Sequence, residues 1–361
     1  MKNKLLLSSA LLGSLVIGSA AYSQTTVTGN LSLSYKSLSE HGTTDDIGTA
    51  TSTRAFGRES QINVQNKGKL NNGMDYAAGF SIENDGSQAT DLSNENVFID
   101  FISGNTTFTI GVDHIQNTNR TLGNFVGNDA SDLATGNPYN VADPAIGFIQ
   151  SAGSNPAQSM GVGVVQRTPV GSLSFLYVPT VGNTGSDNEV GNLNGAASTI
   201  LESNRESAME IGYVGDLGVK GLSAHAFYNV EKENEGDEGK FKGKNFGASY
   251  NFGQITLGYN RKENNDANDV DLKQDEFGLA YSATPNLTLA ANYTKSKSSI
   301  PADIRAANNL DDMTTGKSKS LAVGYNLGPV AVIAQYAKQE DIVNQDGTDQ
   351  DVAFIKINTN F

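Results

Sequence analysis

Histidine is the side chain best suited to acid–base chemistry near neutral pH, and the sequence contains three: His41, His114 and His225. A lipase or protease site would need one of them paired with a serine or an aspartate, and His114 directly follows Asp113. Neither a Gly-x-Ser-x-Gly elbow nor a His-Glu-x-x-His zinc motif occurs. We therefore expect no catalytic residues and interpret the histidines as surface or lumen residues.

Cysteine is absent, which excludes disulfides, thiolate zinc sites and cysteine nucleophiles. With so few nitrogen and sulfur ligands we expect no metal centre and no cofactor. The formal net charge is −14, from 25 basic and 39 acidic residues. Nucleic-acid binding depends on neutralising phosphates with Lys and Arg, so this balance excludes nucleic acid as a partner.

The first 23 residues predict an export signal that is removed from the mature chain. Lys2 and Lys4 supply positive charge, residues 5–17 form an apolar run, and small residues follow. This run is shorter than the ~20 apolar residues that a spanning helix needs. Cleavage is expected before Gln24, with a second candidate site after Ala21. No later segment predicts a transmembrane helix, so the mature chain is periplasmic, secreted or an outer-membrane barrel.

Alternation of apolar and polar residues predicts β-strands along the whole mature chain. In residues 26–36, Val27, Leu31 and Leu33 share one face while Thr28, Asn30 and Ser32 share the other. We predict sixteen such strands, at residues 26–36, 54–65, 76–82, 97–101, 108–112, 160–164, 173–177, 209–213, 222–230, 246–252, 255–259, 277–281, 287–293, 321–325, 330–336 and 353–361.

The connections alternate between short and long, which indicates how the strands are joined. Residues 103–105 and 284–286 form short links, whereas residues 37–52 and 115–157 form long polar ones. This pattern is typical of a transmembrane antiparallel β-barrel with short periplasmic turns and long extracellular loops. Residues 24–361 are therefore predicted to form a single domain of the all-β class.

The chemistry of the two faces favours a barrel over a soluble β-sandwich. The polar faces carry mainly Ser, Thr, Asn and Gly, and most charges lie in the predicted loops. Tyrosines on the apolar faces, such as Tyr35, Tyr259 and Tyr293, suit the interfacial aromatic girdle of a membrane barrel. A barrel of sixteen strands is wide enough for an aqueous channel.

Strand parity identifies the charged residues that face the interior. They are Lys36, Asp75, Glu83, Asp100, Asp113, Arg167, Glu210, Glu231, Lys262, Glu276 and Lys356, with more acids than bases. Arg54 and Arg58 share the parity of the lipid-facing residues Ile62 and Val64, where a charge would cost roughly 2–4 kcal/mol at the bilayer midplane. A bulge near Gly57 or Ser60 could reset this register.

Three features resemble the Gram-negative general porins, which are sixteen-stranded trimeric outer-membrane channels. The last strand ends on the aromatic residue Phe361, residues 96–113 look like the fourth and fifth porin strands, and the longest predicted loop, 115–157, follows directly. The resemblance implies that this third loop folds into the lumen and narrows the channel. It also implies a homotrimer and recognition of Phe361 by the barrel-assembly machinery. The loop lacks the Pro-Glu-Phe-Gly-Gly-like segment of the best-known porins.

The resemblance suggests where the constriction residues lie. The expected acidic residues are Asp113, Asp129, Asp132 and Asp143, and the expected basic wall residues are Lys36, Arg54, Arg58, Arg167 and Lys356. The implied function is passive diffusion of small hydrophilic solutes and ions through an outer-membrane channel. The acidic net charge and the excess of acids among the inward-facing residues predict a mild preference for cations. The expected surroundings are outer-membrane lipid and lipopolysaccharide of a Gram-negative bacterium.

An alternative function remains open at this stage. The acidic segment Glu231–Glu238 and six aspartates towards the C-terminus could bind Ca²⁺ or Mg²⁺, although no EF-hand spacing occurs. These aspartates are Asp303, Asp311, Asp312, Asp346, Asp349 and Asp351. The alternative is therefore a structural, adhesive or divalent-cation-binding barrel.

Overall fold

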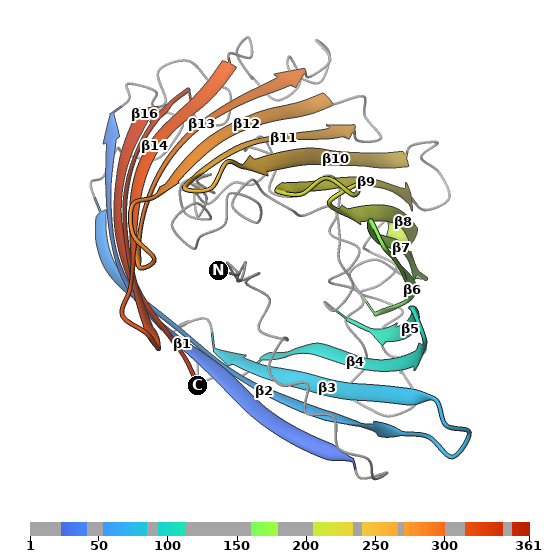
Figure 1. Ribbon diagram of the computed structural model, residues 1–361. Helices are drawn as coiled ribbons and strands as arrows, with labels where there is room; N and C mark the ends of the chain where they lie inside the picture. The colour runs from blue at the N-terminus through green and yellow to red at the C-terminus, as the bar shows by residue number, and fades with distance from the viewer. Residues whose placement is uncertain are drawn as a thin grey trace.

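The computed structural model describes residues 23–41, 53–84, 93–112, 160–179, 205–233, 240–265, 271–299, 315–341 and 349–361. These residues form a closed barrel of sixteen antiparallel strands in which β1 returns to pair with β16 (Figure 1). The predicted fold class and strand number are confirmed. The predicted signal and the loop 115–157 lie outside the described residues.

The strands differ in length around the barrel. Their bounds are β1 (Gln24–His41), β2 (Thr53–Lys69), β3 (Asp75–Asn84), β4 (Ser93–Ser103), β5 (Thr106–Gly111), β6 (Gly161–Thr168), β7 (Gly171–Val178), β8 (Arg205–Gly215), β9 (Leu222–Glu233), β10 (Lys240–Asn251), β11 (Ile255–Asn265), β12 (Asp271–Ser282), β13 (Leu287–Ser299), β14 (Thr315–Asn326), β15 (Val330–Glu340) and β16 (Asp349–Asn360). Among the described residues no helix is long and apolar enough to cross a membrane.

Large apolar side chains point outward from the barrel. Leu33 on β1 is 51% exposed, Phe56 on β2 is 87% exposed and Ile211 on β8 is 57% exposed, and each of the sixteen strands exposes at least one such residue. A soluble protein avoids an apolar band of this extent, whereas a lipid-facing barrel requires one. The predicted alternation therefore separates an apolar outer face from a polar inner face.

Aromatic side chains gather at both ends of this apolar band. On the side of the long connections, the ring of Phe277 lies 5.0 Å from that of Tyr259 and 6.5 Å from that of Tyr293. On the side of the short turns, the rings of Tyr250 and Phe252 are 4.7 Å apart. These positions fit the predicted girdle, because amphipathic rings favour the boundary between hydrocarbon and water.

Short turns of similar sequence close several hairpins on one side of the barrel. In the turn after β10, the side-chain oxygen of Asn251 accepts a 2.9 Å hydrogen bond from the backbone N–H of Gly253. Asn326 and Gly328 repeat this geometry after β14 at 2.8 Å. Both glycines have φ near 93°, a conformation that other residues rarely adopt.

The pairing of β1 with β2 corrects one expectation from the sequence. It runs without a bulge from Gln24, opposite Lys67, to Leu38, opposite Thr53. The expected reset near Gly57 or Ser60 is therefore wrong. The register is irregular instead between Gly79 and Ser81 on β3.

Candidate functional site

The inner wall of β8 to β12 carries a dense group of buried polar and charged side chains. Glu210 on β8, Glu231 on β9 and Lys262 on β11 all lie on the inner face and are 1–3% exposed. Glu276 on β12 belongs to the same group at 1% exposure. Strand alternation explains this placement, because Tyr259, Phe277 and the other apolar neighbours take the outer face.

Glu276 is the centre of a hydrogen-bond network across β11 and β12. Its carboxylate accepts hydrogen bonds from Asn260 at 2.9 Å and from Gln274 at 2.5 Å. The ammonium of Lys262 lies 3.8 Å from the same carboxylate. A buried carboxylate that accepts two hydrogen bonds and lies beside an ammonium group has a fixed position on the inner wall.

A second contact fixes the neighbouring part of this wall. The Nε2 atom of His225 on β9 lies 2.9 Å from the side-chain oxygen of Asn245 on β10. Gly247 lies directly opposite His225, and a Cβ atom at Gly247 would lie 2.7 Å from the His225 ring and from the side-chain oxygen of Asn260. The glycine therefore lets these two polar side chains pack over the strand.

The opposite wall carries two of the predicted basic residues. Lys36 on β1 pairs with the backbone of Phe354, and Lys356 on β16 pairs with Ser34, so both lysines share the inner face. In Figure 1, β1 lies across the ring from β8 and β9, which carry Glu210 and Glu231. The strands that carry the lysines and the strands that carry these glutamates therefore belong to different walls of the barrel.

Arg167 and Asp100 occupy other parts of the inner face. Arg167 lies near the end of β6 that leads into the short turn, opposite Ser172, and its side chain is exposed. Asp100 on β4 is 9% exposed and accepts a 2.6 Å hydrogen bond from the hydroxyl of Thr109 on β5. The predicted acidic residues Asp113, Asp129, Asp132 and Asp143 lie outside the described residues.

The register places Arg54 and Arg58 on the outer face, which corrects their expected position on the channel wall. Arg54 lies opposite Ser37, and Arg58 lies opposite the lipid-facing Leu33. The ring of Phe56, between them in the sequence, contacts Tyr35 on that same face at 5.2 Å. Arg58 is about 11 residues from the turn end of β2, roughly 36 Å along the strand, which brings it near the interface where a charge costs little.

Three charged residues of the inner wall were missed in the sequence: Glu59, Lys67 and Lys69. Uninterrupted alternation along β2 places these three side chains on the inner face. The bulge expected from the sequence would have reversed the faces, so their inward position was not predicted. With these residues included, the described acidic wall residues are Glu59, Asp75, Glu83, Asp100, Glu210, Glu231 and Glu276, and the basic ones are Lys36, Lys67, Lys69, Arg167, Lys262 and Lys356. The two charge signs are therefore close to balanced on these strands.

The chemistry of this wall suits hydrated solutes better than a bound metal. Within the described part of the chain, no group of three or more His, Asp or Glu side chains could hold a metal ion. The rest of the inner face carries short polar residues such as Ser249, Thr288 and Asn292. These side chains can exchange hydrogen bonds with water without filling the wide interior of a sixteen-stranded barrel.

Comparison with known families decides the identity of this barrel. A family model described as Gram-negative porin matches residues 8–358. The chain belongs to the Gram-negative porin family. This membership confirms the resemblance noted in the sequence, and it makes the protein an outer-membrane porin. No curated protein matches the porin significantly.

Solved porin structures share the fold at low sequence identity. OmpTΔL8, a loop L8 deletion mutant of the outer membrane protein OmpT of Vibrio cholerae, is 15% identical with a TM-score of 0.62, over 94% of this chain and 99% of that one. An anion-selective porin from Comamonas acidovorans is 13% identical with a TM-score of 0.62, over 94% and 100% of the two chains. A triple mutant of the Rhodopseudomonas blastica porin is 14% identical with a TM-score of 0.58, over 94% and 100%.

Proposed function

We propose that this porin forms a water-filled channel for the passive diffusion of small hydrophilic solutes and ions. The observation that carries the proposal is the closed sixteen-stranded barrel with a polar inner face. No residue needs to react with the solute, because fixed wall charges and the channel width decide which solutes pass. Conductance steps of the purified mature protein in a planar bilayer test this function. A closed barrel with a purely structural, adhesive or divalent-cation-binding role would give no steps.

A mild preference for cations is the finer part of the proposal. Its support is Glu210 and Glu231 on the inner wall, together with the acidic residues expected on loop 115–157. The near balance of charge on the described strands makes the expected preference small. The anion-selective porin with the same fold means that the sign of selectivity depends on individual side chains and not on the barrel itself.

We propose that loop 115–157 folds inward and narrows this channel. The loop is far longer than its neighbours and follows β5 after Gly111. A loop of this length without predicted secondary structure is uncommon unless it has a function. Asp129, Asp132 and Asp143 would then lie at the narrowest part, with Asp113 at its start.

Strand length supports assembly into a homotrimer. β5 has 6 residues, and β6 and β7 have 8 each, whereas a tilted strand needs about 9–11 residues to cross the hydrocarbon layer. The outer face of these strands is apolar, with Phe108, Ile110 and Phe175 exposed. A neighbouring protomer would cover this short wall better than lipid could. A trimer form of in-vitro folded OmpT of Vibrio cholerae has the same fold.

Export and insertion complete the proposal. Residues 1–23 are expected to be removed, and Phe361 at the end of the last strand is expected to be recognised by the barrel-assembly machinery. The outer face then lies against outer-membrane lipid and lipopolysaccharide. N-terminal sequencing of the protein from outer membranes would test the cleavage before Gln24.

A further inference from the structure

A phenyl ring lies on the inner face of β16, near the middle of the strand. Phe354 is the sixth of the 12 residues of β16. Its neighbour Ile355 points outward and is 49% exposed, so alternation turns Phe354 inward. Asn358 shares the face of Phe354, and its side-chain oxygen accepts a 3.2 Å hydrogen bond from the hydroxyl of Ser32 on the inner face of β1. The ring therefore belongs to a wall that carries mainly short polar residues.

Two lysines flank this ring on the inner face. Lys36 on β1 lies directly opposite Phe354, and Lys356 follows Phe354 by two positions on β16. In an antiparallel pair, the Cβ atoms of opposite residues are about 5 Å apart and those of diagonal residues are about 7–8 Å apart. The ring and both lysine side chains are half-buried, so each keeps some surface towards the interior of the barrel. A single small solute can reach all three side chains.

No acidic residue lies next to either lysine in the sheet. The residues directly opposite the two lysines, and those two positions away on the same strand faces, are Ser34, Leu38, Ala55, Ile333, Phe354 and Asn358. Neither lysine forms an ion pair with any described residue. The described strands therefore leave both positive charges available to an anion.

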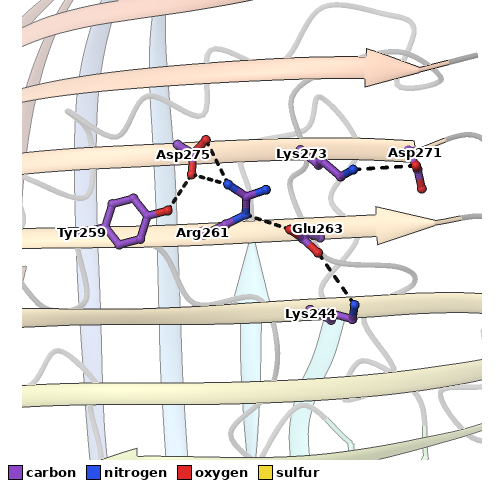
Figure 2. Close-up of polar contacts among 7 residues, drawn as sticks. All are labelled: Lys244, Tyr259, Arg261, Glu263, Asp271, Lys273 and Asp275. Atoms are coloured by element: carbon purple, nitrogen blue, oxygen red, sulfur yellow. Dashed lines mark hydrogen bonds and ion pairs between the residues drawn. The ribbon is translucent and has the colours of Figure 1, made fainter.

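Several other cations of the barrel are held by carboxylates. On the outer face of β11, the guanidinium of Arg261 lies 2.8 Å from the carboxylate of Glu263 and 3.1 Å from that of Asp275 (Figure 2). An anion that approached such a group would first have to displace an acidic side chain. The two lysines beside Phe354 have no such neighbour among the described residues, so an anion can bind them at no comparable cost.

Two apolar side chains extend the surface of the ring. Val352 on β16 lies directly opposite Leu38 on β1, and both share the inner face with Phe354 and are half-buried. Apolar surface that faces water is unfavourable, and a solute with an apolar part removes it from water. The lysines attract an anion, whereas the ring and its two apolar neighbours favour a solute that is not purely hydrophilic.

We propose that Lys36, Leu38, Val352, Phe354 and Lys356 form a binding site for small aromatic carboxylates on the channel wall. The carboxylate lies between the two ammonium groups, and the aromatic ring of the solute stacks on Phe354 and covers the two aliphatic side chains. An aliphatic carboxylate as small as acetate meets only the charges, and an uncharged aromatic alcohol meets only the apolar part. This inference rests on the proposed channel function and names a class of solute for it.

Benzoate is the probe for this site, with acetate and benzyl alcohol as comparison solutes. Their dissociation constants are measured by ligand-observed NMR titration of the full mature porin in detergent. Stacking of two rings strengthens binding by about 3- to 10-fold, so we expect benzoate to bind at least about 3-fold more tightly than acetate. Benzyl alcohol should bind more weakly than benzoate, because it lacks the charge. Equal dissociation constants for benzoate and acetate would overturn the proposal.

Two variants separate the contribution of the ring from that of the charges. Phe354→Leu keeps an apolar side chain without the ring, and it should weaken benzoate binding by about 3- to 10-fold while leaving acetate binding unchanged. Lys36→Gln/Lys356→Gln should weaken benzoate binding by roughly 10-fold for each lysine. Arg54→Gln/Arg58→Gln removes two charges from the outer face of the adjacent strand β2 and is the matched control, which should bind benzoate as the parent does.

Conductance steps in planar bilayers show that each variant has folded. Phe354→Tyr keeps an aromatic ring and should retain both conductance and benzoate binding. Unchanged benzoate binding in a conducting Phe354→Leu variant would refute the role of the ring. Tighter binding of the dicarboxylate succinate than of benzoate to the parent would show that the lysines recognise charge alone, and would also overturn the proposal. A parent that binds benzoate but gives no conductance steps would refute the proposed channel and not this site.

Discussion

Gly29 and Phe361 join the first strand of the barrel to the last residue of the chain by two backbone hydrogen bonds. The N–H of Gly29 donates to the carbonyl of Phe361 at 2.8 Å, and the N–H of Phe361 donates to the carbonyl of Gly29 at 3.0 Å. The phenyl ring lies over the glycine, since a Cβ atom at Gly29 would lie 2.5 Å from the ring. The terminal aromatic residue is therefore part of the barrel seam as well as its expected assembly signal.

This seam predicts that both residues are needed for efficient barrel formation. Deleting Phe361 removes the two hydrogen bonds and the ring that covers Gly29, so we expect less of the heat-modifiable, detergent-resistant form in outer membranes. Gly29→Ala should destabilise the folded barrel by about 1–3 kcal/mol, because the added methyl group meets the ring and the backbone of Gln61. Phe361→Tyr is the control and should fold normally. Unchanged levels after deletion of Phe361 would contradict this role.

The ion pair between Lys262 and Glu276 predicts a strong energetic coupling on the inner wall. Each side chain is at most 2% exposed, so Lys262→Met or Glu276→Gln alone leaves a buried charge without its partner. We expect each single variant to lose about 3 kcal/mol of unfolding free energy and the double variant to lose less than their sum. Denaturant unfolding in lipid vesicles measures this double-mutant cycle. Additive losses would show that the two residues do not stabilise each other.

The register of β1, β2 and β16 predicts which basic residues influence ions in the channel. Lys36→Ser/Lys356→Ser removes positive charge from the inner wall and should shift the zero-current potential in a KCl gradient towards cation selectivity. Arg54→Ser/Arg58→Ser removes the same charge from the outer face and should leave the potential unchanged. A shift of similar size in both variants would contradict the register.

The aspartates expected on loop 115–157 should contribute to the preference of the channel for cations. The parent should favour cations by about fivefold at most, and Asp129→Asn/Asp132→Asn should reduce this preference. At 1 M salt the effect should shrink, because the Debye length falls to about 3 Å. Asp216→Asn, in a short turn, is the matched control for a lost carboxylate. An anion-selective parent would show that the wall lysines dominate.

If loop 115–157 narrows the channel, shortening this loop should widen it. Shortening it between Gly127 and Gly147 should raise the single-channel conductance. It should also increase the size of the largest solute that enters vesicles in a swelling assay. Shortening the segment 301–314 serves as the control and should change neither quantity. Equal conductance in the parent and in the first variant would place the loop outside the channel.

Several features of this porin follow from local sequence alone. Alternation within each strand identifies sixteen strands and their apolar faces, because successive side chains point to opposite sides of a sheet. Turn sequences such as Asn251-Phe252-Gly253 identify the short connections, because glycine adopts the positive φ that they require. These signals involve neighbouring residues and need no knowledge of the rest of the chain.

Other features depend on how strands align with one another. The outward position of Arg58 depends on its pairing with Leu33, and the seam joins Gly29 to a residue at the far end of the chain. Alternation gives the two faces of a strand but not its offset against a partner, and a bulge would reverse the faces. Only the tertiary structure decides these relationships, because they arise from hydrogen-bond register and closure of the whole barrel.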